Sequence, residues 1–113
     1  RAMEEAAARV RAGEVTRAER DARTPAGPVA RGDWMGMVEG EAVYVGPSVV
    51  EAALEVVRRL ADEDSEVVTV LVGSGLTDDE RRGVEEALRA LGSLEVEVVK
   101  GGQPRYPLLL GVE

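Results

Sequence analysis

The chain has 113 residues, which is enough for one domain with a single hydrophobic core. Its formal net charge of -8, from 22 acidic and 14 basic residues, disfavours binding to nucleic acid or to an anionic membrane. Cysteine and histidine are both absent, which excludes disulfides, thiol chemistry, the usual zinc ligands and the commonest general base. Since no apolar run is long enough to span a bilayer and the charged first residues lack the apolar region of a signal peptide, we predict a cytoplasmic protein with no membrane insertion.

The first residues resemble a connection rather than part of the core. Residues 1–12 have small apolar side chains at helical spacing, and Gly13 follows at the position that commonly ends a helix. The chain begins with Arg1 instead of methionine, so we expect a fragment of a longer protein. The pattern predicts that residues 1–13 are a linker helix from a preceding domain and that residues 14–113 form one C-terminal domain.

The next segments predict a small antiparallel layer. Residues 14–23 alternate weakly between two parities, which is typical of an exposed edge strand. Two short apolar segments, 34–38 and 41–45, are joined through Glu39-Gly40, where glycine can supply the positive φ of a tight hairpin. We therefore expect a β-hairpin near the N-terminus.

Two helices are predicted from capping boxes, in which a hydroxyl residue precedes a glutamate by three positions. Ser48 with Glu51 marks the first helix, and Thr77 with Glu80 marks the second. Each box is followed by apolar residues at helical spacing. These are Val50, Ala53, Leu54, Val57, Leu60 and Ala61 in the first helix, and Val84, Ala87, Leu88 and Leu91 in the second.

The helices separate three predicted strands, 41–45, 67–72 and 94–99, which should run parallel through right-handed crossovers. Residues 67–72 are almost continuously apolar and β-branched, as expected for a central strand covered on both faces. Residues 108–112 follow too closely for a crossover, so they should return antiparallel. The sequence therefore predicts an α/β fold: a mixed sheet with a parallel β-α-β-α-β core, an antiparallel C-terminal strand and an N-terminal β-hairpin layer.

In this topology three loops should meet at the carboxyl edge of the sheet, where open α/β sheets usually bind ligands or partners. These loops are 46–48, 73–77 and 101–107. The last one is the most constrained, because two glycines and two prolines flank side chains able to make directional contacts. It is interpreted either as a simple turn or as a preformed docking loop, with Arg105 and Tyr106 as its contacts.

Other candidate sites have simpler interpretations. Gly73-Ser74-Gly75 before a helix could hold a phosphate, but the full glycine spacing is missing and acidic residues follow, so a strand-to-helix turn is favoured. Ser74 has no histidine to activate it as a nucleophile. The acidic run 62–66 lacks the ligand spacing of a calcium loop, and we predict no metal site and no catalytic residue. Trp34, beside two methionines, is interpreted as a core residue, with an interface contact as the alternative.

Several stretches of the sequence also carry a family resemblance. They are Val15-Thr16-Arg17-Ala18 with Arg20-Asp21, Gly32-Asp33-Trp34-Met35-Gly36, Asp62-Glu63-Asp64-Ser65-Glu66-Val67-Val68-Thr69, Gly101-Gly102-Gln103-Pro104-Arg105-Tyr106-Pro107 and the closing Val112-Glu113. Together they resemble the C-terminal domain of the bacterial fatty acid kinase ATP-binding subunit, which is also classed as dihydroxyacetone-kinase-like. The resemblance runs from about Glu14 to the last residue.

This resemblance implies a non-catalytic docking and regulatory domain of an ATP-dependent fatty acid, or dihydroxyacetone-type, kinase. A preceding kinase domain of the same chain would bind ATP and Mg²⁺, and a fatty-acid-binding partner protein would present the substrate; no cofactor is expected in this fragment. The alternative is a stand-alone small-ligand-binding or hydrolase-like domain that uses the Gly73-Ser74-Gly75 turn. The expected partner contacts are Gly101, Gly102, Gln103, Pro104, Arg105 and Tyr106, with Ser74, Gly75 and Trp34 as possible secondary contacts.

Overall fold

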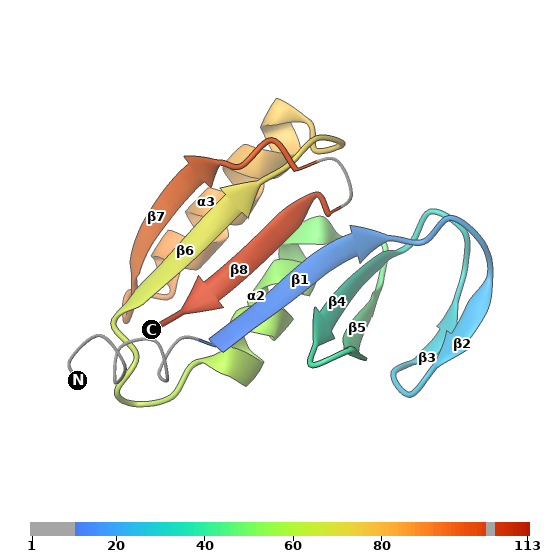
Figure 1. Ribbon diagram of the computed structural model, residues 1–113, viewed down its shortest axis with the longest axis horizontal. Helices are drawn as coiled ribbons and strands as arrows, with labels where there is room; N and C mark the ends of the chain where they lie inside the picture. The colour runs from blue at the N-terminus through green and yellow to red at the C-terminus, as the bar shows by residue number, and fades with distance from the viewer. Residues whose placement is uncertain (1–10, 104–105) are drawn as a thin grey trace.

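The computed structural model describes residues 11–103 and 106–113. Within these residues the chain forms a six-stranded mixed sheet, a separate two-stranded hairpin and two helices (Figure 1). The elements are β1 (Arg11–Arg17), β2 (Ala22–Thr24), β3 (Gly27–Val29), β4 (Trp34–Val38), β5 (Glu41–Gly46), α2 (Val49–Leu60), β6 (Val67–Val72), α3 (Asp78–Ala90), β7 (Glu95–Lys100) and β8 (Leu108–Val112).

The strand order of the main sheet is β5-β4-β1-β8-β6-β7. Only β6 and β7 are parallel neighbours, and every other adjacent pair is antiparallel. This confirms a mixed α/β fold with an antiparallel C-terminal strand. Strand β5 points in the same direction as β6 and β7, but β4, β1 and β8 lie between it and β6. The β4–β5 hairpin is therefore part of the main sheet, and the separate layer is the β2–β3 hairpin.

Strand β1 lies inside the sheet, paired with β4 on one side and β8 on the other, so the edge-strand prediction for this segment is wrong. Gly13 belongs to this strand. A Cβ there would lie 2.5 Å from Val56 Cγ1 and 2.9 Å from the Met37 carbonyl oxygen, so glycine is needed for α2 to pack closely on β1. Of the predicted linker helix, residues 1–10 lie outside the described residues, and residues 11–13 open β1.

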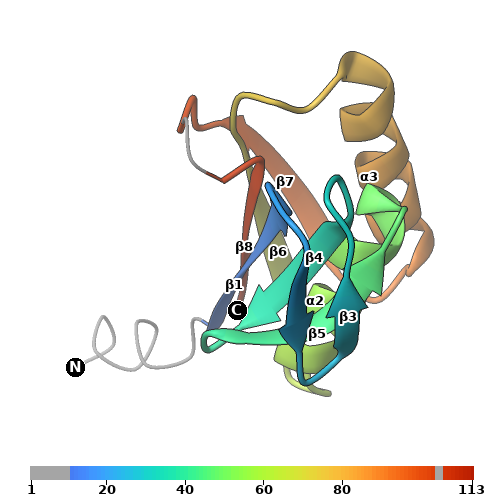
Figure 2. The same cartoon turned by 90° about the vertical axis from the view of Figure 1, so that its right-hand side faces the viewer.

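Both helices cover the same face of the sheet, as Figure 2 shows with the sheet seen nearly edge-on. Strand β6 alternates accordingly: Val68, Val70 and Val72 are buried against the helices, and the residues between them are only half-buried. The prediction that this strand is covered on both faces is therefore wrong for the described part of the chain. The face of the sheet opposite α2 and α3 is called the open face below.

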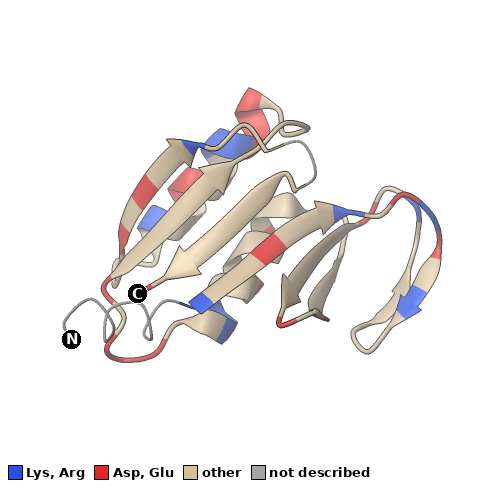
Figure 3. Ribbon diagram, viewed as in Figure 1, with Lys and Arg blue, Asp and Glu red and all other residues tan. Residues whose placement is uncertain are grey.

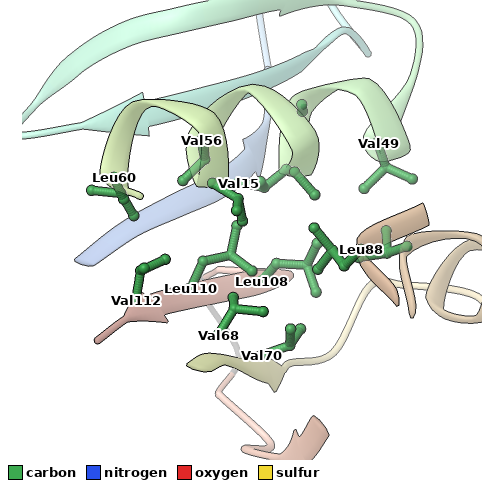
Figure 4. Close-up of a cluster of buried hydrophobic side chains, with 14 of the residues drawn as sticks. Val15, Val49, Val56, Leu60, Val68, Val70, Leu88, Leu108, Leu110 and Val112 are labelled. Atoms are coloured by element: carbon green, nitrogen blue, oxygen red, sulfur yellow. The ribbon is translucent and has the colours of Figure 1, made fainter. Parts of the chain in front are cut away.

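The core lies between the sheet and α2, with α3 closing one end (Figure 4). Val56 of α2 and Leu110 of β8 are among its fully buried side chains, and each such side chain stabilises the fold by about 1.5–3 kcal/mol relative to an exposed one. Both predicted helix starts are confirmed. The Ser48 side chain accepts from the main-chain N–H of Glu51 at 3.1 Å, and Thr77 forms a complete capping box with Glu80. No helix among the described residues is long and apolar enough to cross a membrane.

Candidate functional site

The loop that follows β7 is fastened to the end of β6. The main-chain N–H groups of Gly101 and Gly102 both donate to the Val72 carbonyl oxygen, at 2.9 and 3.2 Å. Gly102 has a φ of 67°, a conformation that glycine adopts without the steric cost other residues meet. The chain therefore turns sharply at this point and crosses the carboxyl end of β6 before β8 begins.

The side chain of Gln103 holds this loop in place. Its Nε2 atom donates to the main-chain carbonyl oxygens of Leu71 and Tyr106, each at 3.0 Å. Its main-chain carbonyl oxygen accepts from the N–H of Ser74 at 3.1 Å. One residue thus connects the strand, the turn after it and the far side of its own loop. This number of main-chain contacts fits a loop with a single defined shape.

Gly73 makes the close approach of the two loops possible. Its N–H donates to the Pro107 carbonyl oxygen at 2.9 Å. A Cβ at this position would lie 2.5 Å from the Gln103 carbonyl oxygen and 2.8 Å from its Nε2. No side chain fits there unless the loop moves. The sequence identified Gly73 only as part of a turn, and nothing local to it could reveal a partner located far later in the chain.

The structure brings together two of the three loops expected at this edge, 73–77 and 101–107, as predicted. The third, 46–48, follows β5 and lies along the same edge of the sheet, with β4, β1 and β8 between β5 and β6 (Figure 1). Within the candidate loop, Gly101 and Gly102 are exposed, while Gln103 and Tyr106 are half-buried. Pro104 and Arg105 lie outside the described residues.

Trp34 is separated from this loop by two strands and faces the helices. It is only 2 % exposed, which confirms its interpretation as a core residue and leaves it little surface for a partner. The guanidinium of Arg17 covers its ring at 5.0 Å from the centroid, in the arrangement of a cation–π contact. Of the possible secondary contacts, Ser74 and Gly75 are exposed beside the loop and Trp34 is not.

The start of α3 does not fit the phosphates of a nucleotide. Its amide donors meet the Thr77 cap, and Asp78, Asp79 and Glu80 place three carboxylates in the first turn. The hydroxyl of Ser74 lies 3.5 Å from the Gln103 carbonyl oxygen, an acceptor that does not make it a nucleophile. Four grooves in the described part of the chain are lined by other residues, and none of them by Ser74.

The acidic loop after α2 uses its carboxylate for local hydrogen bonds. Asp62 Oδ1 accepts from the main-chain N–H of Asp64 at 2.9 Å and from the Ser65 hydroxyl at 3.2 Å, and Oδ2 lies 3.3 Å from Arg11 Nη2. The Asp64 bond is the largest cause that lowers the pKa of Asp62 below its ordinary value of 3.8; Ser65 and Arg11 act in the same direction, and desolvation opposes them. Across residues 11–103 and 106–113, no three acidic side chains gather into a metal cluster.

The open face is a second candidate surface, and the sequence analysis missed it. The strand registers align Met37, Glu14, Leu109, Leu71 and Val99 in one row across five strands. Val99 is 45 % exposed. The alternation of side chains along each strand was visible in the sequence, but the row depends on long-range pairings that local patterns do not specify.

Comparisons with known proteins give the chain a family. Residues 1–113 match the FakA-like C-terminal family, which describes the C-terminal part of proteins similar to the first subunit of fatty acid kinase. The chain is 30% identical over 105 residues to Protein YloV of Bacillus subtilis (strain 168), covering 92% of this chain and 19% of that protein. It is 31% identical over 105 residues to Uncharacterized protein SH1689 of Staphylococcus haemolyticus, with the same coverage of 92% and 19%. It is also similar to Uncharacterized protein SAUSA300_1119 of Staphylococcus aureus, at 31% over 108 residues, again 92% of this chain and 19% of that protein. The chain therefore spans about a fifth of the length of these curated relatives.

Proposed function

Since the chain belongs to the family of FakA-like C-terminal domains of fatty acid kinase, we propose that it is a docking and regulatory domain of a cytoplasmic ATP-dependent kinase. It recruits a fatty-acid-binding partner protein, so that a kinase domain preceding it in the parent polypeptide phosphorylates the bound fatty acid. The fragment itself is not catalytic. ATP and Mg²⁺ bind to that preceding domain, because the acidic start of α3 does not fit nucleotide phosphates.

The observation that carries this proposal is the fixed shape of the loop at residues 101–107. Gln103 ties the loop to β6, and Gly73 lets it lie directly against the turn before α3. A loop ordered before binding loses little conformational entropy when a partner arrives, which favours affinity. Tyr106 and Arg105 supply an amphipathic ring and a planar donor, the residue types that most often dominate the energy of protein interfaces.

The proposal is tested by measuring how tightly the full-length parent protein binds the fatty-acid-binding partner. We expect Arg105→Glu and Tyr106→Ala each to weaken binding by about tenfold or more, the effect of losing an interface anchor. The control is Arg58→Glu, a charge reversal at an exposed residue near the C-terminal end of α2, at the opposite edge of the sheet. Unchanged binding by both loop variants would exclude the loop as the docking surface.

A further inference from the structure

The open face contains a groove that the proposed function leaves unassigned. Its volume is about 450 Å³. Three small residues, Ala12, Gly111 and Thr69, lie side by side across β1, β8 and β6 and form its floor. Larger apolar side chains from the neighbouring row, among them Leu71 and Leu109, form one wall. The groove therefore crosses the middle of the sheet on the face that α2 and α3 leave uncovered.

The charges on this face all have the same sign. Strand alternation places Glu14, Glu95 and Glu97 there, and Glu39 lines the groove at one end. Figure 3, which views the open face, shows acidic bands on β1 and β7. Glu14 stands between Met37 and Leu109, an apolar setting in which burial of its carboxylate requires an opposite charge. Two copies packed face to face would instead bring acidic groups together, so the charge disfavours a second copy.

We infer that the open face is the docking surface for a segment of the parent polypeptide that precedes β1, an apolar segment with a lysine or arginine opposite Glu14. This inference rests on the proposed function, which makes the chain one domain of a longer kinase. The relatives are about five times as long as the matched region, so a parent of that length has ample chain to supply the segment. Strand β1 begins at Arg11, and its next residues, Ala12 and Glu14, line the groove. A preceding segment therefore reaches this surface without crossing the molecule.

The test is cysteine accessibility in the full-length parent protein, with any native cysteines replaced by serine and no partner protein present. Ala12→Cys probes the groove, and Ala90→Cys at the end of α3 is the matched control, because both alanines are exposed in the described structure. We expect the groove cysteine to react with a soluble alkylating reagent about tenfold or more slowly than the control, as for a site that must open before it reacts. Adding Glu14→Lys, which repels the expected cation, should bring the groove rate close to the control rate.

Equal rates for the two cysteines would overturn the inference. Protection that disappears on dilution would overturn it in favour of a second copy, and protection that requires the fatty-acid-binding protein would overturn it in favour of that partner. The proposed function fails separately, because Tyr106→Ala changes the loop and leaves the groove intact. Protection of the groove cysteine should therefore be the same in the Tyr106→Ala background.

Discussion

The side-chain Nε2 of Gln103 donates to the main-chain carbonyl oxygen of Leu71 at 3.0 Å. The two residues belong to the two candidate surfaces: Gln103 orders the loop at the carboxyl edge, and the Leu71 side chain forms part of the open face. A Cβ on Gly101 would collide with Gln103 Oε1, so the loop also fits closely around this side chain. The loop and β6 are therefore mechanically linked, and changes at their contacts should affect both.

Replacing Gln103 by methionine should lower the free energy of unfolding by about 1–2 kcal/mol. The variant keeps the length of the side chain but removes the donor to two main-chain carbonyl oxygens, each such bond contributing about 1 kcal/mol. Urea denaturation measures the change. Ser74→Ala is the control, because its hydroxyl makes only a 3.5 Å contact to the loop. If Gln103→Met unfolds at the wild-type urea concentration, the amide does not hold the loop.

Gly73→Ala should disturb the loop more than the same substitution elsewhere. The new Cβ would lie 2.5 Å from a main-chain oxygen, so the loop must shift, at a cost of about 1–3 kcal/mol. Gly83→Ala in α3 is the matched control, because its Cβ would meet only the end of the Val50 side chain at 3.2 Å. Thermal unfolding compares the two variants. A smaller loss of stability for Gly73→Ala than for Gly83→Ala would contradict the close approach.

The lowered pKa of Asp62 predicts part of the acid sensitivity of the fold. A carboxylate whose pKa is lower in the folded state adds stability above its ordinary pKa of 3.8, and this contribution is lost as the pH falls below that value. We expect Asp62→Asn to flatten the fall in stability between about pH 4 and pH 2, where carboxylates protonate. Denaturation curves at several pH values measure this. Asp79→Asn, which changes an exposed carboxylate on α3, serves as the control.

Removing the Arg17 guanidinium should change both stability and fluorescence. Arg17 covers the ring of Trp34 and donates from Nε to the Gly32 carbonyl oxygen at 3.1 Å. Arg17→Met should cost about 0.5–1.5 kcal/mol through loss of the cation–π contact and the hydrogen bond. Trp34 is the single tryptophan of the chain, so its emission reports on this site directly. Arg20→Met is the matched control; an equal spectral change in both variants would show that the contact has no specific effect.

Local patterns were sufficient to predict the helices and most strands. The hydroxyl–glutamate spacing located the starts of α2 and α3 correctly, because helix capping depends on residues three positions apart. The pairing of β6 with β7 follows from the short β-α-β connection between them. The proximity of the loops 73–77 and 101–107 was a consequence of that topology. These features depend on neighbours in sequence or on general rules of chain connection.

The features that the sequence could not reveal depend on distant contacts. Gly13 follows a helical pattern and was interpreted as a helix end, but its function is to let Val56 of α2 approach β1. The apolar run of β6 suggested cover on both faces, although the described residues cover only one of them. In the candidate loop, Gln103 was expected to contact a partner; the structure shows its amide donating to Leu71 and Tyr106. In each case the other residue lies in an element whose position local patterns do not specify.

The insertion of β8 between β1 and β6 has a consequence for how the molecule folds. Residues 11–46 can pair into a three-stranded half and residues 67–100 into a parallel pair, but neither half hydrogen-bonds to the other through its strands. Only residues 108–112, which come after all the other strands, join them. The joining step closes very long loops and should be slow relative to formation of the hairpin and helices. Until it occurs, the edges of β1 and β6 are unpaired, which makes this stage the most vulnerable to aggregation.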